Sequence, residues 1–313
     1  MNRTVAWTLG VLALVVLAVV LFLLLAGRQP VAEASPSPSA SPTAEPTPSF
    51  NEALLTQRLT VLLVGLDLNE VRREENEAQN ADALMLLSIS ADQSQVVLVS
   101  LPRDTVDLPL PDGNVYDEKI NALYAEQGME ALVGAMEELY GVPIDGHVLL
   151  DMDDFTSLVE AVDGVTANPP EPLRDPQINL DLQPGEQELD PQTALSYVRS
   201  RVDQDYGRMG RQQEVLVDLA RRLVDAEREI DLRALADGLE SLETDLSLDD
   251  LPTYAEIARR AQAATVTNLV ISSQTDPPLI TFEGDRGDGR GYILEPDVDG
   301  IRTEVTSLIP PEE

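Results

Sequence analysis

The sequence predicts an α/β fold in which a central, mixed and largely buried β-sheet is flanked by helices and preceded by one transmembrane helix. Short continuous apolar runs that end at turn residues are typical of strands buried on both faces. Longer segments with helical apolar spacing alternate with these runs, as they do in mixed α/β domains. An uncharged apolar stretch near the amino terminus indicates the membrane helix.

Residues 5–27 are uncharged and almost wholly apolar, and as a helix they are long enough to cross a hydrocarbon layer of ~30 Å. We interpret them as a transmembrane anchor. The alternative is a cleaved signal peptide, because residues 32–34 resemble a cleavage site, but the apolar run exceeds the usual ~7–15 residues. Arg3 and Arg28 on its two sides slightly favour a cytoplasmic segment 1–4. We therefore expect a single-pass protein of the cell membrane.

The rest of the chain divides into a spacer and a folded part. Residues 28–50 are rich in proline, serine, alanine and threonine, and we expect an extended, semi-rigid linker. Residues 51–313 are expected to form one extracytoplasmic domain of ordinary core size. Its motifs lie at about 59–226, and residues 227–313 form a C-terminal extension.

Four apolar runs predict the strands of the central sheet. Leu59–Leu66 reads as a buried central strand that ends at a loop. Ala83–Ser90 and Gln95–Leu101 are separated by a spacing that suits a hairpin. His147–Asp151 is expected to be a strand that leads directly into a helix. Two further strands are expected near the end of the chain, at 270–273 and 291–296.

Apolar spacing and capping residues predict four helices. They are expected at Gly128–Tyr140, Asp153–Val162, Pro191–Arg199 and Gly207 to about Glu229. Gly141 and Gly164 would end the first two, and Asp190 would cap the third.

Composition excludes several classes of function. The net charge of −35 and the pI near 4.1 argue against nucleic acid or an anionic membrane surface as general partner, since both are bound through excess lysine and arginine. The chain has no cysteine, so it has no disulfide, thiol nucleophile or cysteine metal site. Its single histidine, His147, lies in a strand pattern and is interpreted as structural. Any anionic ligand must therefore bind where cations are locally concentrated.

Cations are concentrated between Tyr197 and Gln213. The segment holds Arg199, Arg201, Arg208 and Arg211, and elsewhere the chain keeps a single lysine, Lys119. Arginine pairs bidentately with phosphate oxygens, and Arg208, Arg211 and Gln212 share one face near a helix start, where backbone amides also favour an anion. Alternatively, these arginines pair with Asp203, Asp205 and Glu214 on a solvated surface. The residues alone leave both readings open.

Six sequence blocks in a fixed order resemble the LytR-CpsA-Psr (LCP) family of extracytoplasmic bacterial cell-wall enzymes. They are Leu62–Asp67, Asn80–Ile89, Val99–Thr105, Lys119–Gly128, Ile144–Val165 and Leu195–Gln213. The resemblance implies a phosphotransferase that moves a glycopolymer from a polyprenyl diphosphate carrier to peptidoglycan through a phosphodiester bond. The polymer would be teichoic acid, capsule or another wall glycan.

The resemblance also implies roles for individual residues. Asp67 and Asp82 match the acidic residues that hold Mg²⁺, an ion that prefers carboxylate and phosphate oxygens. Asp82, Arg103, Arg199 and Arg201 would be catalytic, with Asp82 a candidate proton acceptor. The diphosphate would be bound by Arg103, Arg199, Arg201, Arg208 and Gln212, with Lys119 and Arg211 as further candidates.

Other polar residues in these blocks have simpler interpretations. Asp67 could cap a turn, and Arg103 could pair with Asp104 or Asp107. Asp151 precedes a predicted helix and is expected to be its N-cap, not part of a second metal site. Ser196 and Ser200 have no histidine partner in the pattern, so a serine nucleophile has no support.

One position departs from the family pattern. Asn80 stands where the family usually has an arginine, so one phosphate-binding cation is missing, and Arg72 or Arg73 is expected to substitute for it. This departure motivates a second hypothesis, a protein that binds polyprenyl diphosphate or wall polymer without turnover. A third is a polyprenyl diphosphate hydrolase that uses water as the acceptor.

Overall fold

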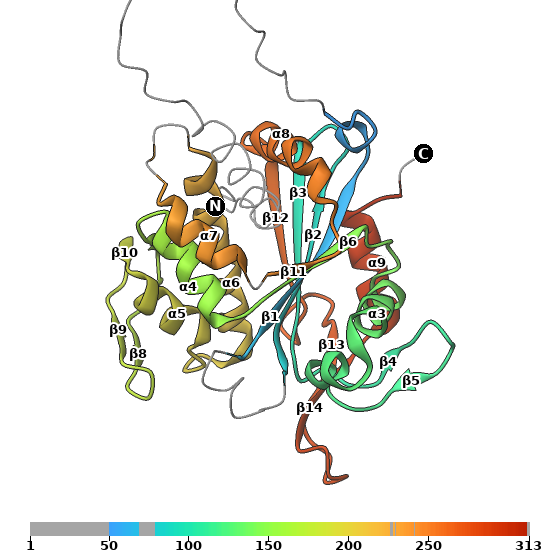
Figure 1. Cartoon of the computed structure of the whole chain (residues 1–313). Coiled ribbons are helices and arrows are strands. Elements are labelled where there is room, and N and C mark those ends of the chain that lie inside the picture. Colours follow the sequence, from blue (N-terminus) through green and yellow to red (C-terminus); the bar gives the residue numbers. More distant parts are fainter. Residues whose placement is uncertain (1–49, 69–78, 226–227, 229, 241, 312–313) are drawn as a thin grey trace, which may run out of the picture.

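A six-stranded mixed sheet forms the centre of the molecule (Figure 1). The computed structural model describes residues 50–68, 79–225, 228, 230–240 and 242–311. The strand order is β11-β6-β1-β2-β3-β12. Its strands are β1 (Leu59–Leu66), β2 (Ala81–Ile89), β3 (Gln95–Leu101), β6 (Gly146–Leu150), β11 (Glu243–Thr244) and β12 (Thr265–Val270). β2 is antiparallel to β1 and β3, whereas β6 is parallel to β1 and β12 to β3, which confirms the mixed sheet.

Alternation along β1 divides the core into two layers. Val61 and Leu63 face one hydrophobic cluster, and Leu62 and Val64 face another, as the two-residue period of a strand requires. The first cluster is covered by α4 (Met152–Ala161), α5 (Pro191–Arg199), α6 (Gln204–Val224) and α8 (Leu251–Ala261), with α7 (Leu232–Glu240) packed on α4. The second is covered by α3 (Ile120–Tyr140) and α9 (Val298–Leu308), on the other side of the sheet in Figure 1.

The caps expected from the sequence are present. The Asp190 carboxylate accepts a hydrogen bond from the Thr193 backbone N–H, and Pro191 occupies the first turn of α5. Asp151 caps α4 in a capping box with Asp154, which confirms its structural reading. Gly141 ends α3 in the left-handed conformation at φ 69°.

The largest differences in extent from the prediction are in two helices and one strand, whereas the other bounds agree to within two residues. α3 begins at Ile120 and contains a non-helical residue, Gly128, at φ 84°. β12 begins at Thr265, five residues before the strand expected at 270–273. α6 begins at Gln204 instead of Gly207. A Cβ on Gly207 would clash with the Asp203 carboxylate, so this glycine leaves room for a carboxylate folded over the first turn.

Four smaller strand pairs and two 3₁₀ turns lie around the central sheet in the described residues. The paired strands are β4 (Leu108–Pro109) with β5 (Val115–Tyr116), β7 (Val165–Ala167) with β10 (Gln187–Leu189), β8 (Leu173–Asp175) with β9 (Leu180–Leu182), and β13 (Ile280–Asp285) with β14 (Tyr292–Pro296). The strand expected at 291–296 is therefore present. The 3₁₀ turns are η1 (Leu54–Thr56) and η2 (Leu248–Asp250).

The predicted anchor at residues 5–27, and the linker up to residue 49, lie outside the described residues. Within the part of the chain that the structure describes, no helix combines the length and the apolar character needed to span a membrane.

Candidate active site

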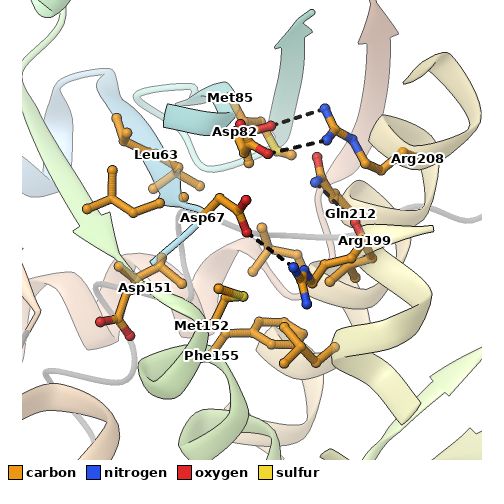
Figure 2. A pocket seen from close by; sticks show the side chains of 18 of the residues that line it. Leu63, Asp67, Asp82, Met85, Asp151, Met152, Phe155, Arg199, Arg208 and Gln212 are labelled. Carbon is orange, nitrogen blue, oxygen red and sulfur yellow. Dashed lines mark hydrogen bonds and ion pairs between the residues drawn. The ribbon is translucent and has the colours of Figure 1, made fainter. Parts of the chain in front are cut away.

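A cavity of about 360 Å³ lies between the sheet and the helices α4, α5 and α6, at the carboxyl end of β1. Figure 2 shows its lining from close by. One part of the wall is apolar and is made by side chains that share a helix face or a strand face: Leu63, Met85, Phe155, Leu158, Leu195, Val198, Leu216 and Leu219. The other part is charged and contains Asp67, Asp82, Arg103, Arg199, Arg201 and Arg208. The cavity is therefore amphiphilic.

Asp82, the second residue of β2, is the centre of the charged part. One of its carboxylate oxygens accepts a short hydrogen bond from Arg103 and another, of 3.1 Å, from Arg201. Arg208 Nη1 lies 3.9 Å from the same oxygen, and Arg208 Nη2 donates to the Asp82 backbone carbonyl at 3.2 Å (Figure 2). A single carboxylate thus brings together guanidinium groups from three parts of the chain.

Asp67 makes a second, separate ion pair. It directly follows β1, and its carboxylate lies 3.3 Å from Nη2 of Arg199, the last residue of α5 (Figure 2). The Asp67 backbone N–H donates to the Asn80 carbonyl at 3.1 Å, so the main chain of Asn80 fixes the end of β1. Arg199 and Arg201 are each 42% exposed, which leaves them accessible to a ligand from solvent.

Burial and neighbouring charge act oppositely on the two inner arginines. Burial lowers the pKa of Arg103, but its hydrogen bond to Asp82 and the charges of Asp82, Asp104 and Asp205 raise that pKa above its ordinary value. Burial dominates at Arg208, whose side chain is only 3% exposed, and lowers its pKa although Asp205 opposes the shift. Asp205 Oδ2 lies 2.9 Å from Arg208 Nη2, so it is the carboxylate that balances the most buried cation.

The charged part has unused binding capacity. Four guanidinium groups line the cavity, and the carboxylates of Asp67, Asp82 and Asp205 pair with them. Three buried side-chain atoms at this place have no hydrogen-bond partner: Asp82 Oδ1, Arg103 Nε and Arg208 Nε. Buried polar atoms are rarely left unpaired in native proteins, so these atoms indicate a site that is completed by a polar ligand.

The residues present fit a hard divalent cation. The unpaired Asp82 Oδ1 and the neighbouring acid Asp67 both line the cavity, and carboxylate oxygens are the protein ligands that Mg²⁺ prefers. No group of three or more acidic or histidine side chains that could hold a metal occurs among the described residues. An ion here would therefore need ligand oxygens from the substrate to complete its coordination.

Three of the candidate ligand residues have other partners. Lys119 Nζ lies 2.9 Å from Asp104, and this lysine does not line the cavity. Arg211 also lies outside the lining, and it donates to the backbone carbonyls of Tyr197 and Ser200. Gln212 does line the cavity, where its side-chain N–H donates to the Val198 carbonyl at 3.2 Å.

The surface pairing that the sequence left open occurs only in part. Asp205 pairs with Arg208 and Asp203 with Arg211, but these arginines are buried, with 3% and 7% of their side chains exposed. Glu214 instead accepts a hydrogen bond from the Tyr197 hydroxyl at 2.7 Å. Arg103 has Asp82, not Asp104, as its closest partner. Asp107 pairs with Arg290.

Two groups of residues were not recognised from the sequence as parts of the site. The sequence suggests Asp205 only as a surface partner, although its spacing of three residues before Arg208 matches a helical ion pair. The apolar lining follows helical spacing, as at Gln212, Leu216 and Leu219, but that spacing is shared with ordinary core residues.

His147 Nδ1 lies 3.1 Å from Asp245 and outside the cavity lining. Arg72 and Arg73 lie outside the described residues.

Comparison with known proteins identifies the family and the fold. The model of the LytR_cpsA_psr family matches residues 28–292. The chain belongs to this family. Among solved structures, Bacillus subtilis TagV superposes with a TM-score of 0.64 at 21% identity, covering 82% of this chain and 99% of that chain, which shows the shared fold.

Three curated relatives are similar to this member of the family. Biofilm regulatory protein A of Streptococcus mutans is 26% identical over 249 residues, covering 75% of this chain and 56% of the relative. Two proteins named polyisoprenyl-teichoic acid–peptidoglycan teichoic acid transferase TagU are 31% and 30% identical. The Enterococcus faecalis TagU match covers 63% of this chain and 64% of that protein. The Halalkalibacterium halodurans match covers 78% and 76%.

Proposed function

We propose that this protein is a membrane-anchored phosphotransferase that joins an anionic glycopolymer, carried on polyprenyl diphosphate, to peptidoglycan through a phosphodiester bond. The observation that carries the proposal is the amphiphilic cavity, with arginines at one part and an apolar wall at the other. A polyprenyl diphosphate has the same division between charged head and apolar chain. The two relatives named teichoic acid transferases support the transfer reaction and the two partners, wall polymer and peptidoglycan.

The arginines would bind the diphosphate and stabilise charge during transfer. Arg199 and Arg201 are half-exposed and can exchange their carboxylate partners for phosphate oxygens, while Arg103 and Arg208 are fixed by burial. Pre-oriented cations of this kind lower the barrier to phosphoryl transfer. Asp67 and Asp82 would hold Mg²⁺, which would neutralise phosphate charge when bound.

The bond changes follow from the substrate. A hydroxyl oxygen of peptidoglycan attacks the phosphorus that carries the glycopolymer, and the bond from this phosphorus to the bridging oxygen breaks. Polyprenyl phosphate leaves with the bonding electrons, and the hydroxyl proton passes to a carboxylate, for which Asp82 is the candidate. Asp82 also holds three guanidinium groups, so its loss should disturb both the cage and the proton transfer.

The test follows transfer by the full-length chain in detergent solution with Mg²⁺, a polyprenyl-diphosphate-linked glycan and peptidoglycan. Arg199→Ala and Asp82→Ala should each reduce glycan attachment by about a hundredfold to a thousandfold, the usual effect of losing a charge-stabilising contact. Arg174→Ala is the matched control, because Arg174 is 67% exposed and pairs with Asp181 outside the cavity. Chelation of Mg²⁺ should abolish attachment in every case.

The same assay separates the competing functions. Release of polyprenyl phosphate without glycan attachment would identify a hydrolase that uses water. Tight binding of the lipid without any release would identify a binding protein and would attribute the loss of turnover to Asn80. Attachment that survives in both cavity variants would contradict the assignment of this cavity as the active site.

The anchor is part of the proposal. Residues 5–27 would hold the domain at the outer face of the cell membrane, where a polyprenyl chain is available, and residues 28–50 would act as the spacer.

A further inference from the structure

Exposed apolar side chains occur beside the arginine cage, defined as Arg103, Arg199, Arg201 and Arg208. Among the described residues, four large hydrophobic side chains are exposed: Phe50, Val115, Val202 and Tyr292. Val202 directly follows Arg201 and is 52% exposed. Tyr292 is 54% exposed and is the first residue of β14. Because aromatic residues make up only 4% of the chain, an exposed tyrosine near the cage needs an explanation.

Backbone pairing places Tyr292 next to the cage. The Leu294 N–H donates to the Asp104 carbonyl at 3.0 Å, and the Val106 N–H donates to the Leu294 carbonyl at 3.0 Å. This parallel bridge pairs Leu294 with Thr105. Asp104 adjoins Arg103 in the chain, and Tyr292 lies two residues before Leu294, so the start of β14 lies close to the cage.

The face of the hairpin that carries Tyr292 is turned toward the start of α6. Tyr292 pairs with Asp285 across β13, and Glu283 lies two residues away on the same face. Glu283 accepts a hydrogen bond of 2.8 Å from the hydroxyl of Tyr206, in the first turn of α6. Figure 1 shows the hairpin at the end of the sheet where β1 finishes, which is the end that holds Asp67 and Asp82.

Electrostatics agree with this placement. Burial raises the pKa of Tyr292, and the nearby charges of Glu283, Asp104 and Asp205 raise it further. Asp104 adjoins Arg103, and Asp205 pairs with Arg208 and Arg201, so the phenol lies near carboxylates on both sides of the cage. The rim beside the cage thus combines one aromatic face with several carboxylates.

This combination suits a sugar ring better than a lipid or phosphate surface. The C–H face of a pyranose packs on an aromatic ring, and carboxylates accept hydrogen bonds from its hydroxyls. Carboxylates repel the phosphates of anionic lipids. If the arginines bind a diphosphate and the apolar wall binds its prenyl chain, the sugar joined to the other phosphate would extend past this rim.

We propose that Tyr292, with the carboxylates of Glu283 and Asp285, forms a pyranose subsite at the rim of the cavity. The inference rests on the proposed function and deepens it, because it names the part of the substrate that the hairpin β13–β14 recognises. The ring belongs either to the sugar joined to the diphosphate or to the acceptor glycan. In both cases Tyr292 determines specificity and is not a catalytic residue.

The test measures dissociation constants of the full-length chain for two probes, a polyprenyl diphosphate and the same lipid carrying one pyranose. Tyr292→Ala should weaken binding of the sugar-bearing probe by roughly fivefold to tenfold, the usual size of an aromatic stacking contact, and should change binding of the sugar-free probe less than about twofold. Tyr292→Phe keeps the ring and should bind both probes like wild type. Val115→Ala, another exposed hydrophobic substitution but on β5, is the matched control.

Each outcome decides the proposal. Loss of affinity for the sugar-bearing probe alone assigns the donor sugar to the subsite. Unchanged affinity for both probes, with a raised KM for peptidoglycan in Tyr292→Ala but not in Tyr292→Phe, assigns the acceptor sugar. Equal weakening of both probes, or no change in either affinity or KM, overturns the subsite while the proposed function stands. Failure of wild-type protein to bind either probe overturns the proposed function and the subsite together.

Discussion

Arg211 shows how a residue of the arginine-rich segment can serve the site without lining it. Its guanidinium donates to the Tyr197 carbonyl at 2.9 Å, also donates to the Ser200 carbonyl, and pairs with Asp203 at 2.5 Å. These partners surround Arg199 and Arg201 in the chain. Arg211 therefore holds the turn between α5 and α6 that aims those two arginines at the cavity.

Replacing Arg211 by lysine should test this positioning role. A lysine keeps the charge but cannot span three partners in one plane, so we expect the free energy of unfolding to fall by about 1–3 kcal/mol. Affinity for a sugar-free polyprenyl diphosphate should fall as well, because Arg199 and Arg201 lose their orientation. Urea unfolding and lipid titration of the full-length chain measure the two effects. Arg174→Lys serves as control, and normal stability together with normal affinity would contradict the role.

The sequence predicted which charged residues belong to the site, but not which of them line the cavity and which hold the neighbouring turn. Asp67, Asp82, Arg103, Arg199, Arg201, Arg208 and Gln212 all line one cavity. Arg208 and Arg211 lie three residues apart on α6 and look alike in the sequence, yet one faces the cavity and the other the α5–α6 turn. Helical spacing predicts the direction of a side chain only to within about one residue, so it does not show which of the two arginines lines the cavity. In the structure, Arg211 is the one that pairs with the Asp203 carboxylate.

At the scale of elements, the strands were easier to predict than the cavity. β1, β2 and β3 are continuous apolar runs whose burial leaves little choice of structure. The apolar wall between α4, α5 and α6 follows the same pattern as a packed core, because the apolar spacing of a helix does not show whether its face meets another element or a void.

Ion pairs between Glu256 and two arginines on α8 should make the stability of the protein depend on pH. Hydrogen bonds from Arg259 and Arg260, together with their charges, lower the pKa of Glu256 from 4.5 to about 2, although burial opposes the shift. Because the folded-state pKa is the lower one, the stabilisation is present above about pH 4.5 and is lost as the pH falls toward 2. Both arginines are exposed, so solvent screening limits the contribution to about 1 kcal/mol.

The measurement compares wild type with Glu256→Gln by urea unfolding at several pH values. The variant should be less stable by about 1 kcal/mol at pH 7. The difference should shrink as the pH falls below about 4.5. A difference that stays constant down to pH 2.5 would show that packing of Glu256, and not its charge, stabilises α8.

At the scale of the whole molecule, the C-terminal segment is part of the central fold. β12 pairs with β3 along six residues, from Thr265 to Val270. α9 packs on α3 and buries Ile301 and Val305 in the second core cluster. β14 bridges to Thr105, next to the cage. The motifs that carry the resemblance in the sequence end near residue 226, and for that reason they could not show that the tail completes the sheet.

Ile301→Ala should measure how much α9 contributes to the domain. Ile301 is fully buried, so we expect the free energy of unfolding to fall by about 2–5 kcal/mol through lost contacts and the cavity left behind. Glu304→Ala, on the exposed side of the same helix, should change stability by less than about 0.5 kcal/mol. Urea unfolding of the full-length proteins provides both values, and equal effects of the two substitutions would mean that α9 is not integral to the core.

The ion pairs of Asp67 and Asp82 have a consequence for which anions the protein retains. The guanidinium groups of Arg199 and Arg201 are already paired with the carboxylates of Asp67 and Asp82. An incoming anion must therefore displace carboxylates that are covalently part of the same chain. A soluble phosphate gains little from this exchange. An amphiphile gains in addition about 0.8 kcal/mol for each methylene that it buries against the apolar wall. On the proposed function, we therefore expect the protein to bind a lipid-linked phosphate more tightly than a small soluble one.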